Sequence, residues 1–432
     1  MKSAALLLLS TMAVIPLAAH AQWKDVQYLG AGGESTEAPD GLGSVYITAH
    51  LPCVLYASSD WGAHVTKLQD FPDSLGDMFV LGRQGGKLNV VYTRKALNGI
   101  GTWFSNDHGE TIKQGENFPG PLDREWLVEN PAGKGLLMDY TDGYIGGPKS
   151  KGVFLAKSVD DGMSFEKITR IDQEPPGSYG VDPYLTTSTK GRLYAMWQVS
   201  TDYNTIDSFK FAYSDDGGVT FSNPQVVAEF PKEVGGQKVD TQERWILGSV
   251  LGVGEKTVVV TYPGYEQIMI NGEPNMAFVE HYKVSFDGGV TFSKGRTLSS
   301  GHELASAVKE FNANKQAEEH FPYYIQLLPW QCRDPKGGVH FVFTDNRLGQ
   351  GAINGKYYGT WQVRHTESVD LASGFGESEP VSEPYTCLRP PMDFVSCAAD
   401  SKFLYVTWTA TPNSTGDFQF TGRLNLGRKP LK

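Results

Sequence analysis

One eight-residue segment recurs along the chain, and this repeat restricts the possible folds more than any other feature. Its fullest copy is Ser214–Phe221 (SDDGGVTF), and similar copies begin at Ser105, Ser158 and Ser285. A weaker copy begins at Ser58, and one at Ser368 has lost the glycine. Serine and aspartate side chains cap nearby backbone groups, and glycine accepts a positive φ, so each copy predicts a tight turn between two strands.

A second pattern precedes the repeated segment and puts the repeats in phase. Its clearest copy is an apolar stretch at Asp182–Leu185, a turn at Lys190-Gly191 and a second stretch at Leu193–Trp197. Equivalent stretches begin at Asp77, Arg124, Glu243, Pro329 and Met392. Apolar and aromatic runs bounded by glycine turns are typical of β-strands. Each repeat therefore predicts two strands, a variable loop, a third strand that ends in the repeated segment, and a fourth strand.

Units of four strands cannot bury both of their faces alone, so consecutive copies predict a β-propeller. The predicted fold class is therefore all-β, with four-stranded blades around a channel. The first unit, residues 44–58, is irregular because no inner strand is recognisable ahead of it. Counting this unit gives seven blades, which we prefer, and rejecting it gives six. We expect Val26–Leu29 to pair with the last unit near Phe418–Leu424 and so close the ring without exposed sheet edges.

The composition agrees with a β-rich chain that has many turns. It includes 49 glycines, 20 tyrosines, 22 phenylalanines and 9 tryptophans. A formal net charge of -11 and the lack of any lysine and arginine cluster argue against nucleic acid as a partner. Because the repeat spans the chain, we expect residues 22–432 to form a single domain, and we expect a monomer.

Residues 1–21 have the pattern of a cleaved secretory signal peptide. Lys2 precedes an apolar run from Ala4 to Leu17, and Ala19-His20-Ala21 supplies the alanines of a cleavage site after Ala21. No other stretch of the sequence is apolar for long enough to span a bilayer. The sequence therefore predicts a secreted or periplasmic protein.

The four cysteines all lie in the part predicted to be exported, where disulfides can form. They are Cys53, Cys332, Cys387 and Cys397. A Cys387–Cys397 bridge belongs to one of the three complete pairings that four cysteines allow, and buried free thiols are the alternative. Their spacing matches no zinc motif, and no nucleotide-binding loop or haem motif is present. The sequence therefore assigns no metal ligands and predicts no cofactor, with a Ca²⁺ ion in a carboxylate-rich loop as the alternative.

Loops at one end of the predicted blades converge at the mouth of the channel. Three arginines in these loops, Arg124, Arg244 and Arg389, come from alternate blades at similar depth, and Arg347 lies in a longer loop. Guanidinium groups arranged in this way would clamp an anionic group through bidentate hydrogen bonds. The alternative is that each arginine pairs with a neighbouring carboxylate and holds the blades together.

Acidic residues in the same loops are candidates for acid–base catalysis, because a glycosidase needs one protonated carboxyl and one ionised partner. They are Asp123, Glu125, Asp182, Glu243 and Asp393, of which Asp182 is assigned to substrate binding. Aromatic residues recur beside them as Phe79, Trp126, Tyr184, Trp245, Trp330 and Phe394. Trp126 and Trp245 are assigned to the substrate site, with core packing as the alternative for the whole set. His50 is the one histidine that we retain as a candidate catalytic residue under the hypothesis that the protein is a lyase.

On these repeats, the chain resembles the sialidase-like, Asp-box β-propeller superfamily over nearly all of residues 27–425. The resemblance implies a propeller fold and an arginine triad, which would fall on Arg124, Arg244 and Arg389. It also implies a tyrosine nucleophile, for which Tyr184, activated by Glu243, is the candidate. Sialidases carry a Phe-Arg-Ile-Pro segment at their first arginine, and this chain has none near its start.

Three functions are compatible with these features. The first is an exported sialidase-like glycoside hydrolase that acts on an acidic or decorated glycan. The second is a polysaccharide lyase that acts on a uronate-containing glycan. The third is a propeller that binds glycans or proteins without catalysis, because a shared fold does not fix a shared activity.

Overall fold

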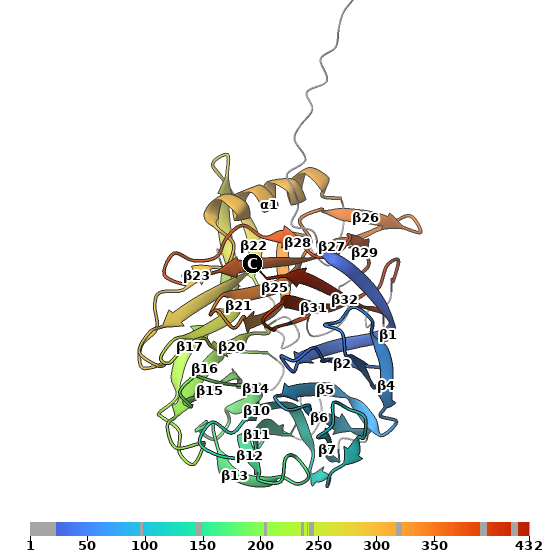
Figure 1. Ribbon diagram of the computed structural model, residues 1–432. Helices are drawn as coiled ribbons and strands as arrows, with labels where there is room; N and C mark the ends of the chain where they lie inside the picture. The colour runs from blue at the N-terminus through green and yellow to red at the C-terminus, as the bar shows by residue number, and fades with distance from the viewer. Residues whose placement is uncertain are drawn as a thin grey trace, which may run out of the picture.

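The computed structural model describes residues 23–95, 98–143, 149–202, 205–234, 237–239, 241, 246–316, 322–388, 395–415 and 422–431. The predicted leader, residues 1–21, lies outside these ranges. Within them the chain consists of β-strands and one α-helix, α1 (Gly301–Asn314), which confirms the all-β fold class (Figure 1). In this described part, no helix has the length and hydropathy needed to cross a membrane.

Most strands form four-stranded antiparallel units whose members follow one another in the chain, as the repeats predict, and one parallel pairing, of residues 277–278 with residues 324–325, joins two of these units. The first strands are β1 (Lys24–Pro39), β5 (Ser74–Arg83), β10 (Leu122–Glu129), β14 (Tyr179–Thr187), β20 (Ser249–Gly252), β24 (Tyr324–Arg333) and β30 (Ser396–Ala399). The second strands are β2 (Val45–His50), β6 (Lys87–Arg94), β11 (Leu136–Asp142), β15 (Leu193–Ser200), β21 (Val258–Ile270), β25 (Val339–Asp345) and β31 (Phe403–Ala410).

The outer strands complete these sheets. The third strands are β3 (Val54–Ser58), β7 (Gly99–Ser105), β12 (Val153–Ser158), β16 (Ser208–Ser214), β22 (Glu273–Ser285), β27 (Lys356–Ser368) and β32 (Gly422–Pro430). The fourth strands are β4 (Thr66–Asp70), β8 (Lys113–Gln114), β13 (Glu166–Arg170), β17 (Gln225–Glu229), β23 (Arg296–Thr297) and β28 (Glu379–Pro380). Short additional strands are β9 (Phe118–Pro119), β18 (Glu233–Val234), β19 (Gln237–Lys238), β26 (Gln350–Ile353) and β29 (Tyr385–Thr386).

Strand β1 belongs to two sheets. Its first half pairs with β32, with Gln27 opposite Leu426, and its second half pairs with β2, with Ala38 opposite Tyr46. The second half is the inner strand that the sequence pattern did not reveal. One continuous strand therefore joins the first repeat to the last.

Successive sheets meet through their first strands. Each of these strands contacts the first strand of the next sheet along the chain, and β30 also contacts β1. In Figure 1 the colours run around the molecule in chain order, and the red strands β31 and β32 lie beside the blue strand β1. Residues that are far apart in the sequence therefore gather at the ends of the first strands.

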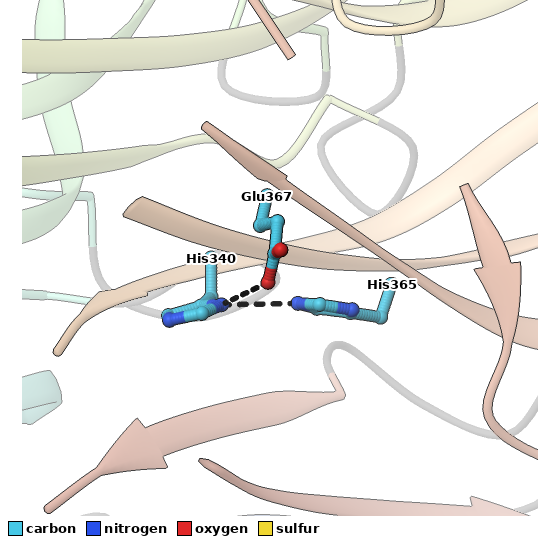
Figure 2. A group of neighbouring side chains, drawn as sticks. All are labelled: His340, His365 and Glu367. Carbon is cyan, nitrogen blue, oxygen red and sulfur yellow. Dashed lines mark hydrogen bonds and ion pairs between the residues drawn. The ribbon is translucent and has the colours of Figure 1, made fainter. Parts of the chain in front are cut away.

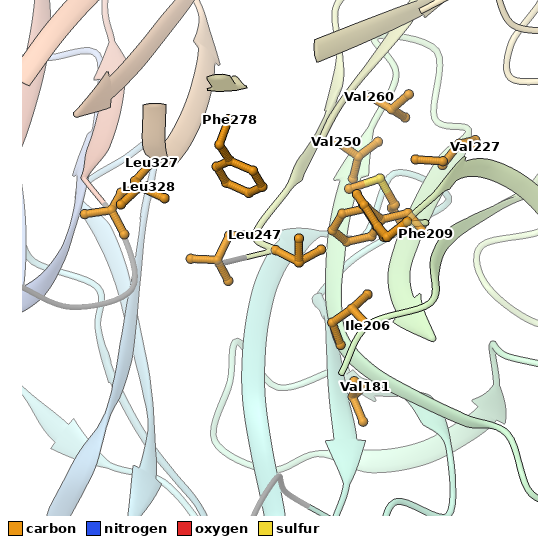
Figure 3. Close-up of a cluster of buried hydrophobic side chains, with 14 of the residues drawn as sticks. Val181, Ile206, Phe209, Val227, Leu247, Val250, Val260, Phe278, Leu327 and Leu328 are labelled. Atoms are coloured by element: carbon orange, nitrogen blue, oxygen red, sulfur yellow. The ribbon is translucent and has the colours of Figure 1, made fainter. Parts of the chain in front are cut away.

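Apolar side chains fill the space between neighbouring sheets. One buried cluster includes Val181 from β14, Phe209 from β16, Val250 from β20, Phe278 from β22 and Leu327 from β24 (Figure 3). Each large side chain buried in this way stabilises the fold by about 1.5–3 kcal/mol. The sheets thus bury faces against one another that no single sheet could bury.

The repeated segments form a turn, here called the Ser–Asp turn, that links a third strand to the chain beyond it. At Ser214 the hydroxyl donates to Asp216 Oδ1 at 2.8 Å and accepts from the Gly218 amide at 2.9 Å. Asp216 accepts from both the amide and the hydroxyl of Thr220, and these bonds lower the pKa of its carboxyl to about 2. Equivalent bonds form in the copies that begin at Ser58, Ser105, Ser158 and Ser285.

Removal of one serine from a Ser–Asp turn should destabilise the protein measurably. Ser214→Ala deletes the buried hydroxyl that accepts from the Gly218 amide, so we expect the free energy of unfolding to fall by about 1–2 kcal/mol. The matched control is Val219→Ala, because Val219 lies in the same turn with 65% of its surface exposed. Urea unfolding followed by fluorescence measures both changes, and equal stability of the two variants would contradict the expectation.

The described cysteines form one disulfide, between Cys332 and Cys397, with their Cα atoms 5.8 Å apart. Cys53 and Cys387 are free and buried. The Cys387–Cys397 pairing considered from the sequence is therefore wrong. Its error has a physical reason: β24 and β30 are first strands of neighbouring sheets, so contact across 65 residues replaces proximity in sequence.

Candidate functional site

Five of the seven first strands have a bulge near one end, where two consecutive stretches of pairing are out of register. The bulges lie between Gly33 and Thr36 in β1, Gly76 and Phe79 in β5, Asp123 and Trp126 in β10, Val181 and Tyr184 in β14, and Leu327 and Trp330 in β24. One residue in each bulge has a positive φ: Glu34 (41°), Asp77 (45°), Arg124 (57°), Asp182 (47°) and Leu328 (60°). The bulges therefore place equivalent residues at one end of neighbouring strands.

These positive φ values mark the bulges as unusual, because side chains other than glycine rarely adopt this backbone conformation. Strained backbone of this kind clusters at functional sites, where the surrounding structure holds it in place. Four of the five residues, Glu34, Asp77, Arg124 and Asp182, are ionisable. We call the group formed by these four residues, together with His50 and Glu125, the mouth site.

Arg124 lies between two carboxylates from the strands on either side of β10. Its Nη1 is 3.5 Å from Asp77 Oδ1 in β5, and its Nε is 3.6 Å from Asp182 Oδ1 in β14. The side chains of Arg124, Asp77 and Asp182 are 12%, 24% and 8% exposed. These contacts match the ion-pair alternative for Arg124, and they also leave part of the guanidinium and of Asp77 within reach of a ligand.

His50 and Glu34 form a buried ion pair beside Asp77. Burial lowers the pKa of His50, but the charge and hydrogen bond of Glu34, aided by Asp77, more than offset this effect and raise the pKa to about 9. The ring lies directly on Gly76, where a Cβ atom would be 2.4 Å from Cε1 of His50. Any larger residue at position 76 would displace the ring. His50 therefore supplies a fixed positive charge at the mouth site.

Glu125 is the buried acid of the mouth site. It is 2% exposed, and Thr93 Oγ1 donates to its Oε2 at 3.0 Å. Burial raises the pKa of Glu125 well above its usual range, and the negative charges of Asp77 and Asp123 raise it further. Glu125 is therefore a protonated carboxyl. It lies near Asp77, whose carboxylate pairs with Arg124.

Aromatic side chains form a wall next to Arg124. Trp126 stacks on Tyr184 with ring centroids 6.1 Å apart, and it contacts Trp330 at 5.1 Å and Phe79 at 5.0 Å. The hydroxyl of Tyr184 accepts from the Gly248 amide at 3.4 Å. The cavity between Arg124, Trp126, Asp182 and Trp330 has a volume of only about 10 Å³, room for about one water molecule. This wall therefore packs closely against Arg124 and leaves little open space.

A larger pocket, here called the tyrosine pocket, lies beside this wall. It has a volume of about 280 Å³ and is lined by Phe230, Ile246, Tyr262, Tyr265, Glu266 and His281, among others. Ile246 lines the tyrosine pocket, whereas Leu247 and Gly248 line the small cavity, so the segment that leads into β20 separates the two. A pocket of this volume with an aromatic lining can hold a small organic group.

Polar groups in the tyrosine pocket are also paired. His281 Nε2 lies 2.9 Å from Glu266 Oε1, and this hydrogen bond lowers the pKa of Glu266, although burial opposes the shift. Tyr262 stacks on His281 at 5.4 Å, and burial with the charge of Glu266 raises the pKa of Tyr262 to about 12. The pocket thus presents an oriented imidazole and a tyrosine hydroxyl that stays protonated at neutral pH.

The structure brings some of the sequence-predicted residues together and leaves others untested. Asp123, Arg124, Glu125, Trp126, Asp182 and Tyr184 lie on neighbouring bulges at the mouth. Glu243, Arg244, Trp245, Arg389 and Asp393 lie outside the described residues. Glu34, Glu266 and His281 were not predicted, because no repeat position identifies them.

Arg347 does not lie on a bulge. Its Nε is 2.7 Å from Asp345 Oδ2, and its Nη2 is 3.1 Å from Glu303 Oε1 in α1. The residue is 9% exposed, and it joins α1 to the end of β25. Binding a substrate would require Arg347 to break these contacts.

No protein-family model matches the chain, and no curated protein matches it in sequence. Among solved structures, it is similar to an alpha-L-arabinanase from Penicillium chrysogenum complexed with arabinobiose, with a TM-score of 0.44 and 14% identity over 80% of this chain and 90% of that chain. An alpha-L-arabinofuranosidase from Fusarium graminearum in complex with an iminosugar inhibitor has a TM-score of 0.46 and 12% identity over 82% and 92%.

A third similar structure is an ulvan lyase of polysaccharide lyase family PL25 bound to -[GlcA(1-4)Rha3S]-. It has a TM-score of 0.47 and 13% identity over 76% of each chain. These scores and identities are too low to assign a reaction to this chain.

Proposed function

We propose that this protein is an exported carbohydrate-active enzyme, a glycoside hydrolase that acts on an acidic or decorated glycan at the mouth site. The observation that carries the proposal is the contrast between Glu125, whose pKa is raised, and Asp77, whose carboxylate pairs with Arg124. Hydrolysis of a glycosidic bond needs one carboxyl that donates a proton and one carboxylate that stabilises positive charge on the sugar. Glu125 in the bulge of β10 is the candidate proton donor, and Asp77 in the bulge of the neighbouring strand β5 is the candidate carboxylate.

In this proposal the residues take distinct roles. Glu125 donates the proton to the leaving oxygen, and Asp77 is the carboxylate partner. Arg124 and the positive charge of His50 attract an anionic group of the glycan. The tyrosine pocket holds a neighbouring sugar unit. Glu243, Arg244, Trp245, Arg389 and Asp393 remain predicted members of the site, as does Tyr184 as nucleophile.

We further infer that the sheets form a closed ring of seven blades, a single domain of residues 22–432, of the sialidase-like kind. The contacts between successive first strands support this ring, as does β1, which pairs with both β2 and β32. The recurring bonds of the Ser–Asp turns support the resemblance. Export follows from the leader predicted at residues 1–21, and a monomeric state is part of the proposal.

A glycan panel with paired anionic and neutral members tests the binding role of Arg124. We expect Arg124→Gln to lower turnover of the anionic glycans at least about 10-fold more than turnover of their neutral counterparts, because it removes a positive charge that lies partly exposed at the mouth site. The control is Arg94→Gln, since Arg94 pairs with Asp73 at 2.7 Å outside the mouth site. Equal losses on both glycan classes would contradict the assignment.

A polysaccharide lyase is the second candidate, and the tyrosine pocket favours it. A lyase needs a base that removes a proton from the uronate and a positive group that neutralises its carboxylate. The dyad of His281 and Glu266, with Tyr262 stacked on the imidazole, offers such a base. The same panel separates the two reactions, because a lyase product contains a double bond that absorbs in the near ultraviolet. Binding without any product would identify a non-catalytic protein.

A further inference from the structure

A second group of titratable side chains lies at the other end of the strands. His340 is near the start of β25, opposite Cys332, whereas the mouth-side end of β25 is Asp345, opposite Gln326 at the start of β24. His365 and Glu367 lie near the end of β27, just before the segment that begins at Ser368. Figure 2 shows the two imidazole rings edge to edge with Glu367 beside them. The group is therefore separate from the mouth site.

Each imidazole of this group faces a carboxylate on its outer side. His340 Nε2 lies 3.4 Å from Asp334 Oδ2, and His365 Nδ1 lies 3.1 Å from Glu379 Oε1. An ionised carboxylate only accepts hydrogen bonds, so it is satisfied when the outer ring nitrogen that faces it carries the proton. In that tautomer a neutral imidazole has no second N–H group, and both inner nitrogens, His340 Nδ1 and His365 Nε2, offer lone pairs.

The two inner nitrogens are 3.1 Å apart. Two lone pairs that face each other at this distance repel unless a cation lies between them. His340 and His365 are 2% and 1% exposed, so both nitrogens lie inside the protein. A metal ion satisfies both lone pairs without charging either imidazole.

We propose that His340 Nδ1, His365 Nε2 and Glu367 Oε2 bind a divalent transition-metal ion, with Zn²⁺ as the best fit. The three atoms lie within 4.8 Å of one another, and Glu367 Oε2 is 3.7 Å from His340 Nδ1. With metal–ligand distances of about 2.0–2.1 Å, these separations give an angle of about 100° between the two nitrogens and about 125° between nitrogen and oxygen. Both are close to tetrahedral.

The ligand types and the surrounding charges agree with this metal. Two imidazoles and one carboxylate suit Zn²⁺, whereas Ca²⁺ and Mg²⁺ prefer oxygen ligands throughout. Asp334 and Glu379 then act as outer partners that orient the rings, as is usual for histidines that bind zinc. Lys429 Nζ lies 2.7 Å from Glu379 and 3.9 Å from Glu367. The three carboxylates and this lysine leave two negative charges, which a divalent ion balances.

The position of the site indicates a structural role. Its residues come from β25 and β27, and Lys429 comes from β32 of the next sheet along the chain. The disulfide between Cys332 and Cys397 joins the same two sheets nearby, and His340 pairs with Cys332 in register. A bound ion would therefore hold β25 and β27 together, beside the contacts that Lys429 and the disulfide make between the two sheets, and leave the mouth site untouched.

Metal titration of the chelator-treated full-length protein tests this site. We expect calorimetry to show one Zn²⁺ bound per chain, and Co²⁺ to give the visible absorption of a tetrahedral site. Glu367→Gln should weaken Zn²⁺ binding at least about 10-fold, and His365→Gln should abolish it. The control is Glu383→Gln. Glu383 is exposed and lies between β28 and β29, so its replacement should leave Zn²⁺ binding unchanged.

Two results would overturn the proposal. One is the absence of saturable Zn²⁺ or Co²⁺ binding by the wild-type protein. The other is equal affinity in the wild type and in Glu367→Gln, which would show that the ion binds elsewhere. Glu367 decides the matter even if His365→Gln fails to fold, because its side chain is 51% exposed and its replacement disturbs no core.

Discussion

Glu125→Gln is expected to lower kcat for glycan hydrolysis by about 10²- to 10⁴-fold and to leave KM nearly unchanged. An amide has the same shape as a protonated carboxyl but cannot donate a proton to a leaving group, and general-acid catalysis contributes this range of acceleration. Because burial already keeps Glu125 neutral, the substitution does not change the charge of the folded site. The fold should therefore survive, and the loss should be confined to the chemical step.

The matched control for this variant is Glu129→Gln in the same strand, β10. Glu129 is 64% exposed and pairs with Arg83 at 3.0 Å, so its replacement should leave kcat within a factor of two or so. Steady-state kinetics on the best glycan of the panel measures both variants. Turnover by Glu125→Gln at the level of Glu129→Gln would remove Glu125 from the mechanism.

Glu37→Gln is expected to make the protein more stable than the wild type at pH 8 and about equally stable at pH 5. Glu37 is buried between the first and last repeats, where Ser396 and Thr407 donate hydrogen bonds to its Oε2. Burial raises its pKa to about 8 from about 4.5, although these two hydrogen bonds oppose the shift. Between these pH values the folded protein holds a proton that the unfolded chain has released.

Unfolding therefore releases this proton, and the wild type loses roughly 1.4 kcal/mol of stability for each pH unit between about 5 and 8. The difference from Glu37→Gln should reach on the order of 4 kcal/mol at pH 8 and vanish below the unfolded pKa. Urea unfolding at several pH values measures the slope, with Glu110→Gln as the exposed control. Parallel pH profiles of wild type and Glu37→Gln would contradict the expectation.

The sequence predicted the repeated sheets well because their strands are marked by local chemistry. Glycine turns and Ser–Asp turns fix where strands begin and end, so β5, β6, β10, β11, β14 and β15 lie where the pattern placed them. The inner half of β1 was missed because its sequence, Gly33–Pro39, has no apolar run. Its pairing with β2 comes from the sheet around it, and not from its own residues.

Helix α1 was also missed, although its start carries a recognisable signal. The Glu303 amide donates to Ser300 Oγ at 3.2 Å, and serine followed three residues later by glutamate is typical of a helix start. The buried face of α1, with Leu304, Val308 and Phe311, confirms the helical spacing of apolar residues. The sequence interpretation used only the repeats, which consist of strands and turns, so it predicted no helix between β23 and β24.

The candidate site was harder to predict than the fold because it depends on contacts between sheets. Arg124 and Asp182 were selected from their repeat positions, but the pairing of Arg124 with Asp77 and Asp182 follows from the order of first strands. His281 and Glu266 come together because β21 and β22 extend beyond their repeats and pair there. No spacing within a single repeat encodes that contact.

The most direct test of the proposed hydrolysis is a glycan digest in water labelled with heavy oxygen, followed by mass spectrometry of the products. The mouth-site mechanism predicts one labelled oxygen for each bond cleaved, at the new reducing end of one of the two fragments, formed by the wild type and not by Glu125→Gln. Unlabelled fragments with near-ultraviolet absorbance, or no fragments from any anionic glycan, would contradict it.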